Sequence, residues 1–193
     1  MIDGYHSKMH TVLMPRSLWR LIAFIFFLLA THVACERQSE MPTTVILVRH
    51  AEKAAVAGDD PPLSDVGVKR AQLLAGVVGD AGIQIVYCSQ FRRTRETAEP
   101  LLALTVARLN TVAVPFDDVR GYAANIRRDI TENHSGKTIL IVNHSNTVPA
   151  LVEALGGKSV SPIRDDEYDN LFILTIPSDA TAPTRIVKAR YTL

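Results

Sequence analysis

Two apolar, β-branched runs in this chain of 193 residues end on basic side chains. Residues 43–48 read TTVILV and are followed by Arg49 and His50, while residues 138–143 read TILIVN and are followed by His144. Unbroken apolar runs of this kind are typical of strands buried on both faces of a parallel sheet. Such a sheet needs helices on both faces, which constrains the chain to an α/β architecture.

The rest of the chain predicts an alternation of strands and helices. Further strands are expected at 83–88, 111–116, 171–176 and 185–192. The third of the six expected strands is the weakest of these predictions, because Pro115 lies inside it. The alternation predicts a three-layer α/β/α sandwich with a mostly parallel central sheet, formed by one domain over residues 43–193.

The helices are predicted from capping residues and from apolar spacing. Ser64 is the expected N-cap of a helix that ends near Gly82, and Asp117 or Asp118 is expected to cap a helix that runs to about residue 133. Further helices are expected after residue 90 and over 145–157. The expected inward face of the helix after Ser64 carries Val68, Ala71, Leu74, Ala75 and Val78.

The first 35 residues have the composition of an export signal. Arg16 and Arg20 precede an apolar run that is too short for an ordinary membrane span, and small residues follow it. The sequence HVAC resembles a bacterial lipobox, so Cys35 is a candidate for lipidation; an ordinary cleaved signal and an uncleaved anchor are the alternatives. We therefore expect a leader over 1–35, a polar tether over 36–42 and an exported envelope protein, either periplasmic or attached to the membrane.

Charge and cysteine content narrow the possible partners. The formal net charge is +1, with no block of like charges, so the composition gives no reason to expect a nucleic-acid partner. The two cysteines, Cys35 and Cys88, form no CxxC or Cys/His metal pattern, and we expect Cys88 to be a small buried residue.

Basic and hydroxyl side chains follow three of the predicted strands. They are Arg49 with His50, Ser89 with Arg92 and Arg93, and His144. The carboxyl ends of parallel strands form the ligand-binding edge of an open α/β sheet, so these groups should converge into a cationic pocket. Guanidinium groups match the geometry of phosphate, and an imidazole can act as a phosphoryl-accepting nucleophile. This chemistry requires no metal or other cofactor; a metal site of His50, Glu52 and His144 is the less favoured alternative, because the arginines would repel a cation.

Four motifs in order resemble those of the histidine phosphatase superfamily, also called phosphoglycerate mutase-like. They are VRHAEK (48–53), LSDVGVKRAQ (63–72), SQFRRTRETA (89–98) and VNHSNTVPAL (142–151), and the RHAEK form is similar to that of small bacterial members. Ala51 stands where the commonest form of the first motif has glycine. The resemblance covers essentially all of residues 43–193.

The resemblance implies roles for individual residues. His50 would be the phosphorylated nucleophile, and Arg49, Arg93 and His144 would bind the phosphate; Arg93 is preferred over Arg92 by its spacing from Ser89. Ser89 would either lend its hydroxyl to the substrate or cap the following helix.

Two positions in the sequence could supply the general acid that protonates the leaving group. Glu52 is slightly favoured, and Asp117 or Asp118 is the alternative, because many members of the family carry their acid after the third strand. The acidic segment 165–174 is expected to be a solvated turn; if it reaches the pocket instead, Tyr168 would offer a stacking surface there.

The implied function is that of a metal-independent phosphatase. It would hydrolyse phosphate monoesters through a phosphohistidine on His50 and would act on a phosphorylated small molecule or a phosphoprotein. The alternatives are an inactive module that binds phosphate or phosphoproteins, and a mutase or phosphohistidine-protein phosphatase.

Overall fold

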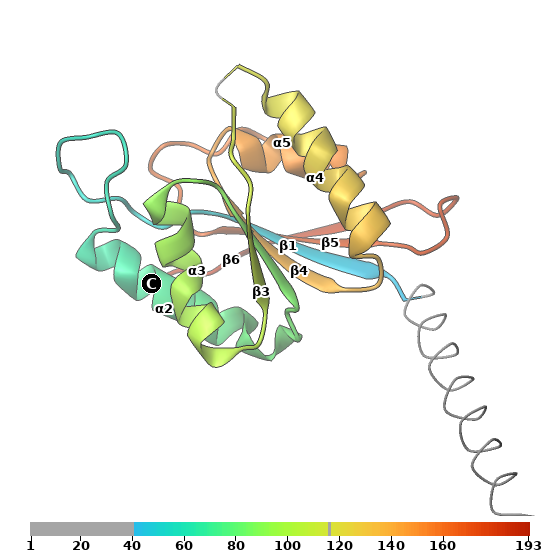
Figure 1. The fold of residues 1–193 in the computed structure, drawn as a ribbon, viewed down its shortest axis with the longest axis horizontal. Helices are drawn as coiled ribbons and strands as arrows, with labels where there is room; N and C mark the ends of the chain where they lie inside the picture. The colour runs from blue at the N-terminus through green and yellow to red at the C-terminus, as the bar shows by residue number, and fades with distance from the viewer. Residues whose placement is uncertain (1–40, 116) are drawn as a thin grey trace, which may run out of the picture. The chain divides into compact units, whose positions relative to one another are not determined.

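The computed structural model describes residues 41–115 and 117–193, which form a six-stranded sheet flanked by helices (Figure 1). The expected leader over 1–35 and most of the tether lie outside the described residues, so these two predictions stay predictions. The strands are β1 (Thr43–Arg49), β2 (Ile85–Cys88), β3 (Arg108–Thr111), β4 (Thr138–Asn143), β5 (Asn170–Ile176) and β6 (Arg185–Arg190). The α-helices are α2 (Asp65–Val78), α3 (Arg92–Leu104), α4 (Val119–Asn133) and α5 (Thr147–Ala154).

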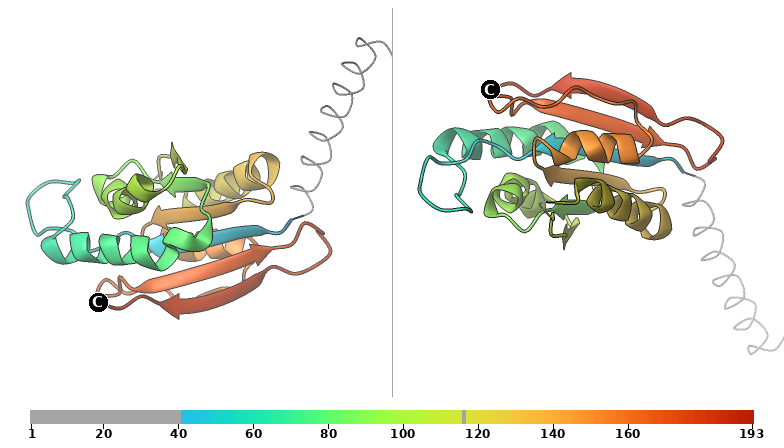
Figure 2. Two further views of the ribbon diagram at one scale, coloured as in Figure 1. Left: turned by 90° about the horizontal axis from the view of Figure 1, so that it is seen from below. Right: turned by 90° about the horizontal axis from the view of Figure 1, so that it is seen from above.

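The strand order is β3-β2-β4-β1-β5-β6, and the first four strands of this order are parallel. The late strands β5 and β6 run antiparallel to their neighbours and lie at one edge of the sheet (Figure 2). In the pairing of β1 with β4, Arg49 lies opposite Asn143. The predicted mixed sheet dominated by parallel strands is confirmed, and the two strands that deliver His50 and His144 are direct neighbours.

The central strands are buried on both faces, as their apolar runs predicted. On one face Val45 and Leu47 of β1 belong to a core shared with α4 and α5, whereas Ile46 and Val48 belong to a second core shared with α2 and α3. Successive side chains of a strand point to opposite faces, which explains why an unbroken apolar run fits this position.

Helix α2 begins as predicted but differs in one residue of its inward face. The amide of Gly67 donates to the hydroxyl of Ser64 at 3.1 Å, which makes Ser64 the N-cap. The prediction that Val68 faces inward was wrong: Val68 is exposed, and Gly67 is the buried residue of that turn. A Cβ at position 67 would clash with the carbonyl oxygen of Glu52, so only glycine lets the helix approach the chain after β1 this closely.

The third strand lies upstream of its predicted position. The prediction of 111–116 was wrong, because the residues that pair with β2 are Arg108–Thr111. Beyond them Val114 is held by a side chain: its amide donates to Oε1 of Gln90 at 2.9 Å. β3 pairs only with β2, so its exposed edge carries no apolar pattern that could mark it in the sequence.

The remaining boundaries differ by a few residues. Strand β2 begins at Ile85 rather than at residue 83, and α5 covers Thr147–Ala154 rather than 145–157. Asp118 is the N-cap of α4, since the amide of Gly121 donates to its Oδ1 at 2.8 Å.

The side chain of Cys88 is fully buried, as expected from the sequence. This burial raises the pKa of the Cys88 thiol to about 12.

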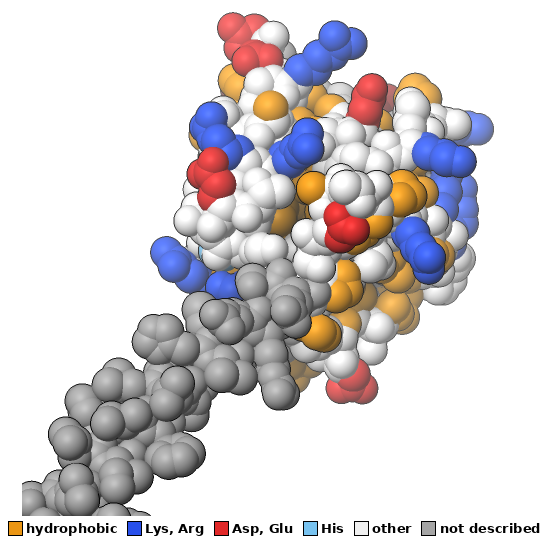
Figure 3. Space-filling view, turned by 90° about the vertical axis from the view of Figure 1, so that its right-hand side faces the viewer, with side chains coloured by type: hydrophobic (Ala, Val, Ile, Leu, Met, Phe, Trp, Pro, Cys, Tyr) orange, Lys and Arg blue, Asp and Glu red, His pale blue; other side chains and the backbone are white. Residues whose placement is uncertain are grey.

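Basic and acidic side chains both lie on the face seen in Figure 3, and several basic side chains gather along its right-hand edge. Within the part of the chain that the structure describes, none of the helices combines the length and apolar character that crossing a membrane requires.

The close approach of Gly67 predicts the effect of a single added methyl group. Gly67→Ala should lower the free energy of unfolding by roughly 1–3 kcal/mol, because the new Cβ pushes α2 away from the Glu52 backbone. Gly76→Ala in the same helix is the matched control, since a Cβ there meets no atom within 4 Å; it should leave stability unchanged or raise it by up to about 1 kcal/mol. Urea denaturation followed by circular dichroism measures both, and equal effects of the two substitutions would contradict the packing argument.

Candidate active site

A pocket of about 260 Å³ lies at the carboxyl ends of the parallel strands. His50 follows β1, and its amide donates to the carbonyl of Asn143 at 2.8 Å, which places the ends of β1 and β4 side by side. The rings of His50 and His144 are 5.3 Å apart between centroids. The pocket is lined by Arg49, His50, Lys53, Phe91, Arg93, Val114, Pro115, His144, Ser145, Asn146 and Asp165.

The imidazole of His50 is buried and oriented by one backbone hydrogen bond. The side chain is 5% exposed, and its Nδ1 lies 2.7 Å from the carbonyl oxygen of Ala51. A carbonyl can only accept, so Nδ1 carries the proton in this bond and Nε2 keeps a free lone pair. Ala51 is itself fixed, because its amide donates to the hydroxyl of Thr97 at 2.9 Å.

His144 is held through both its ring and its backbone. Its Nε2 lies 2.9 Å from the hydroxyl of Ser89, and its amide donates to Oγ1 of Thr147 at 2.9 Å. Ser89 is fully buried and does not line the pocket. Ser89 therefore contacts His144 rather than the pocket, and the N-cap of α3 is Phe91, without a side-chain cap.

A network of buried polar side chains, which the sequence did not predict, contacts His144. Thr147 donates to Oδ1 of Asn143 at 2.7 Å, and Nδ2 of Asn143 donates to the hydroxyl of Tyr122 at 2.6 Å. All three side chains are buried, and burial raises the pKa of Tyr122 to about 12. The one available sequence signal was the asparagine that ends the otherwise apolar run before His144.

Arg49 is buried beneath the segment 164–168. Its Nη1 donates to the carbonyls of Arg164 at 2.7 Å, Asp165 at 3.0 Å and Glu167 at 3.0 Å, and its guanidinium lies 4.1 Å from the centre of the Tyr168 ring. Its Nε is buried and has no hydrogen-bond partner among the described residues. The segment thus reaches the site through its backbone and through Tyr168, whose ring centroid is 6.2 Å from that of His50.

Three acidic side chains in and next to that segment, those of Asp166, Glu167 and Asp169, meet basic partners. Arg190 binds Glu167 at 3.1 Å and Asp169 at 2.7 Å, and Arg164 binds Asp166 at 2.9 Å. The expectation of a simple solvated turn was wrong, because only some of its side chains face solvent while its carbonyls accept from Arg49.

Arg93 lines the pocket, whereas Arg92 points to the surface. The guanidinium of Arg93 lies 4.2 Å from the centre of the Phe91 ring, and its Nη1 is 3.8 Å from Asp60. Arg92 instead pairs with Glu96 at 3.0 Å on the exposed side of α3. The structure thus brings Arg49, His50, Arg93 and His144 together in one pocket.

Glu52 points away from this group. Its carboxylate accepts from Nε and Nη2 of Arg70 at 2.7 to 2.9 Å, and it does not line the pocket. The structure therefore does not bring Glu52 together with the two histidines, and the general-acid role of Glu52 stays a prediction without geometric support.

Among residues 41–115 and 117–193, no three His, Cys, Asp or Glu side chains are arranged to hold a metal ion.

Both pocket histidines are neutral at pH 7. Burial lowers the pKa of His50 to about 3, with smaller contributions from His144 and the nearby arginines. Burial likewise lowers the pKa of His144 to about 4, with contributions from Arg93 and Arg49. The positive charge of the pocket therefore comes from its arginines and Lys53, while the imidazoles keep their lone pairs.

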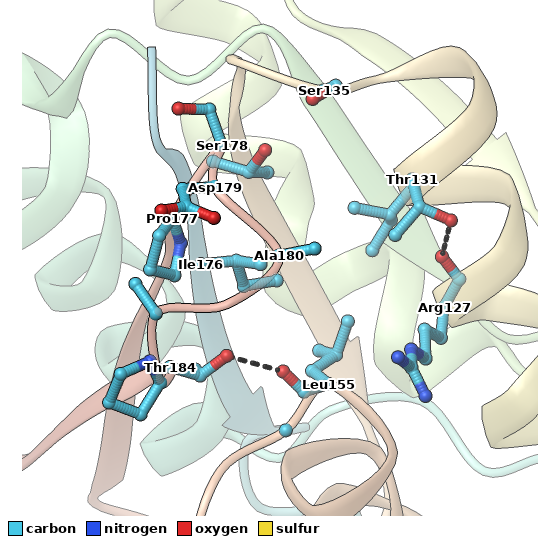
Figure 4. A pocket seen from close by; sticks show the side chains of 15 residues that line it. Arg127, Thr131, Ser135, Leu155, Ile176, Pro177, Ser178, Asp179, Ala180 and Thr184 are labelled. Carbon is cyan, nitrogen blue, oxygen red and sulfur yellow. Dashed lines mark hydrogen bonds between the residues drawn. The ribbon is translucent and has the colours of Figure 1, made fainter. Parts of the chain in front are cut away.

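A second cavity of about 470 Å³ lies near Thr43, at the opposite end of β1 (Figure 4). It lies between the ends of α4 and α5 and the loop that joins β5 to β6. Of the residues that the structure describes, Arg127 is the one basic residue that lines this cavity, and no described histidine does. It lacks the pairing of imidazole and guanidinium groups that makes the first pocket a candidate for phosphoryl chemistry.

The lowered pKa values predict a loss of stability in mild acid. In the unfolded chain the imidazoles of His50 and His144 take up protons near pH 6.5, whereas in the folded protein they do so only near 3 and 4. The unfolded state thus binds more protons between these limits, so stability falls as the pH falls. From pH 7 to pH 5 we expect a loss of about 2 kcal/mol for each histidine in urea denaturation. A His144→Gln variant should lose less over the same range; an identical slope would contradict the assignment.

Comparison with known proteins agrees with this geometry. Residues 45–113 match a family model described as the histidine phosphatase superfamily (branch 1). No curated protein was found to match the chain in sequence.

Solved structures of phosphatases share the fold. A putative phosphohistidine phosphatase SixA from Nakamurella multipartitia is 21% identical with a TM-score of 0.58, over 79% of this chain and 98% of that one. The protein histidine phosphatase SixA complexed with tungstate is 20% identical with a TM-score of 0.60, over 76% and 96%. A phosphoserine phosphatase from Entamoeba histolytica is 14% identical with a TM-score of 0.58, over 78% and 98%. The match over residues 45–113 and the shared fold confirm the predicted resemblance of this chain to the histidine phosphatase superfamily.

Proposed function

We propose that this domain hydrolyses phosphate monoesters in two phosphoryl transfers, first to His50 and then to water. The observation that carries the proposal is the hydrogen bond of 2.7 Å between Nδ1 of His50 and the Ala51 carbonyl. It leaves Nε2 as a free nucleophile in a pocket that also contains Arg49, Arg93 and His144.

The charges of the pocket support phosphoryl transfer. The low pKa of His50, about 3, keeps its lone pair available throughout the neutral range. The guanidinium groups of Arg49 and Arg93 can stabilise the negative charge on the phosphoryl oxygens in the transition state. The buried and unpartnered Nε of Arg49 is one donor that a bound phosphate oxygen would satisfy. These residues need no metal ion or cofactor for the scheme.

The substrate class is a phosphorylated small molecule or a phosphoprotein. The names of the two SixA structures favour phosphohistidine proteins as a second candidate substrate, while the phosphoserine phosphatase favours a small phosphate monoester. The pocket is small, about 260 Å³, which suits a phosphoryl group and the first atoms of its leaving group. A panel of phosphorylated amino acids, sugars and proteins would separate these substrates.

The first test is hydrolysis of p-nitrophenyl phosphate by the full chain in the presence of EDTA. Wild type should turn over, and His50→Ala should lose activity by a factor of at least about 10³, because the covalent intermediate can no longer form. Retained turnover in His50→Ala would show that another group is the nucleophile, and loss of wild-type turnover with EDTA would show that a metal ion is needed.

Arg127→Gln is the control for nonspecific damage, because Arg127 lines the distant cavity rather than the pocket of His50. Its activity should equal that of wild type. Tungstate binding by a folded wild-type chain that shows no turnover would favour the alternative of an inactive phosphate-binding module.

We also propose that residues 1–35 export the protein and that Cys35 carries a lipid anchor. The support is the sequence alone: basic residues, a short apolar run and the HVAC motif. Expressed in a bacterium, wild type should fractionate with membranes and incorporate labelled palmitate, whereas Cys35→Ser should do neither. Cys88→Ser is the matched control, because Cys88 is buried in the domain. Equal labelling of wild type and Cys35→Ser would contradict the proposal.

A further inference from the structure

Asp165 is the one acidic residue among the described residues that line the pocket of His50. The other described lining residues are basic, neutral or apolar. Asp165 lies on the segment between α5 and β5, far along the sequence from the strand ends that supply the rest of the pocket. It was not among the general acids expected from the sequence.

None of the general acids expected from the sequence lines the pocket. The carboxylate of Glu52 is bound by Arg70, that of Asp118 caps α4, and Asp117 is not a lining residue. Asp60 accepts from the amide of Arg92 at 2.8 Å, lies 3.8 Å from Arg93 and does not line the pocket. The carboxylate of Asp165, in contrast, forms no hydrogen bond or ion pair with any described residue, so it is free to exchange a proton with a ligand.

The backbone around Asp165 is anchored to the phosphate-binding arginine itself. Nη1 of Arg49 donates to the carbonyl of Asp165 at 3.0 Å and to those of Arg164 and Glu167. The Glu167 carboxylate also accepts from the amide of Arg164 at 3.0 Å and binds Arg190 at 3.1 Å. The segment is therefore tied both to the pocket and to β6, which holds Asp165 at the pocket rim at a fixed distance from Arg49.

We propose that Asp165 is the general acid and base of the reaction, an inference that rests on the function proposed above. In the first transfer, Nε2 of His50 forms a bond to phosphorus, the bond between phosphorus and the ester oxygen breaks, and that oxygen takes the proton of the Asp165 carboxyl group. In the second, the Asp165 carboxylate takes a proton from water as its oxygen attacks phosphorus and the bond to Nε2 breaks. His50 and protonated Asp165 are regenerated, and phosphate is released.

Lys53 is the other lining residue that could donate a proton from a flexible side chain. The two donors are distinguished by substitution.

The test compares two substrates with leaving groups of different basicity. Dinitrophenolate leaves without protonation, whereas phenolate leaves much faster when it is protonated. In Asp165→Asn, kcat/KM for phenyl phosphate should fall by about 10²–10⁴ while kcat/KM for dinitrophenyl phosphate changes little. The asparagine keeps the backbone carbonyl that Arg49 binds, so the segment should stay in place.

Asp166→Asn is the matched control, because its carboxylate pairs with Arg164 at 2.9 Å and does not line the pocket. It should hydrolyse both substrates like wild type. Equal losses on both substrates in Asp165→Asn would assign Asp165 a structural role and overturn the proposal, as would no loss on either. A selective loss of phenyl phosphate hydrolysis in Lys53→Met or Glu52→Gln, with none in Asp165→Asn, would move the role to that residue. Full wild-type activity in His50→Ala would instead overturn the phosphohistidine mechanism itself.

Discussion

The parallel pairing of β1 with β4 is the constraint on which the site depends. It sets Arg49 opposite Asn143, and the next amide, that of His50, donates to the Asn143 carbonyl. A register slip of one residue would turn every side chain of β1 to the other face and remove its apolar residues from their cores. The burial of β1 on both faces therefore fixes the positions of the two histidines as well as the sheet.

Arg49 joins the pocket to a segment more than a hundred residues later in the chain. Its Nη1 is shared by three carbonyls, and Tyr168 covers its guanidinium, so its position is set by the segment as much as by β1. A buried guanidinium keeps its charge and needs acceptors for its donors. The three carbonyls satisfy part of this need and leave Nε without a partner among the described residues, so in the proposed function one side chain is both a structural anchor and a phosphate ligand.

Burial keeps the imidazoles of His50 and His144 neutral, and it lowers the stability of the fold in mild acid. Removal from water favours the neutral imidazole, and the neighbouring arginines act in the same direction. A neutral His50 has the lone pair that nucleophilic attack requires. The same preference means that protons bind more readily to the unfolded chain in mild acid, so the feature that favours the proposed catalysis weakens the fold at low pH.

The sequence by itself determined the elements whose signals are local. The strands β1 and β4, the Ser64 cap and the presence of Arg49, His50 and His144 at strand ends could be predicted, because an unbroken apolar run and a capping residue act over a few neighbours. The position of β3 could not, since an edge strand with exposed side chains has little apolar pattern.

Only the tertiary structure decided which polar groups meet. It paired Glu52 with Arg70 from the following helix, set Ser89 against His144 rather than against the pocket, and brought Asp165 to the rim through its backbone bond to Arg49. Each of these contacts joins residues that are distant in sequence. Carboxylates and hydroxyls find their partners by the packing of whole elements, and spacing along the chain carries no record of that packing.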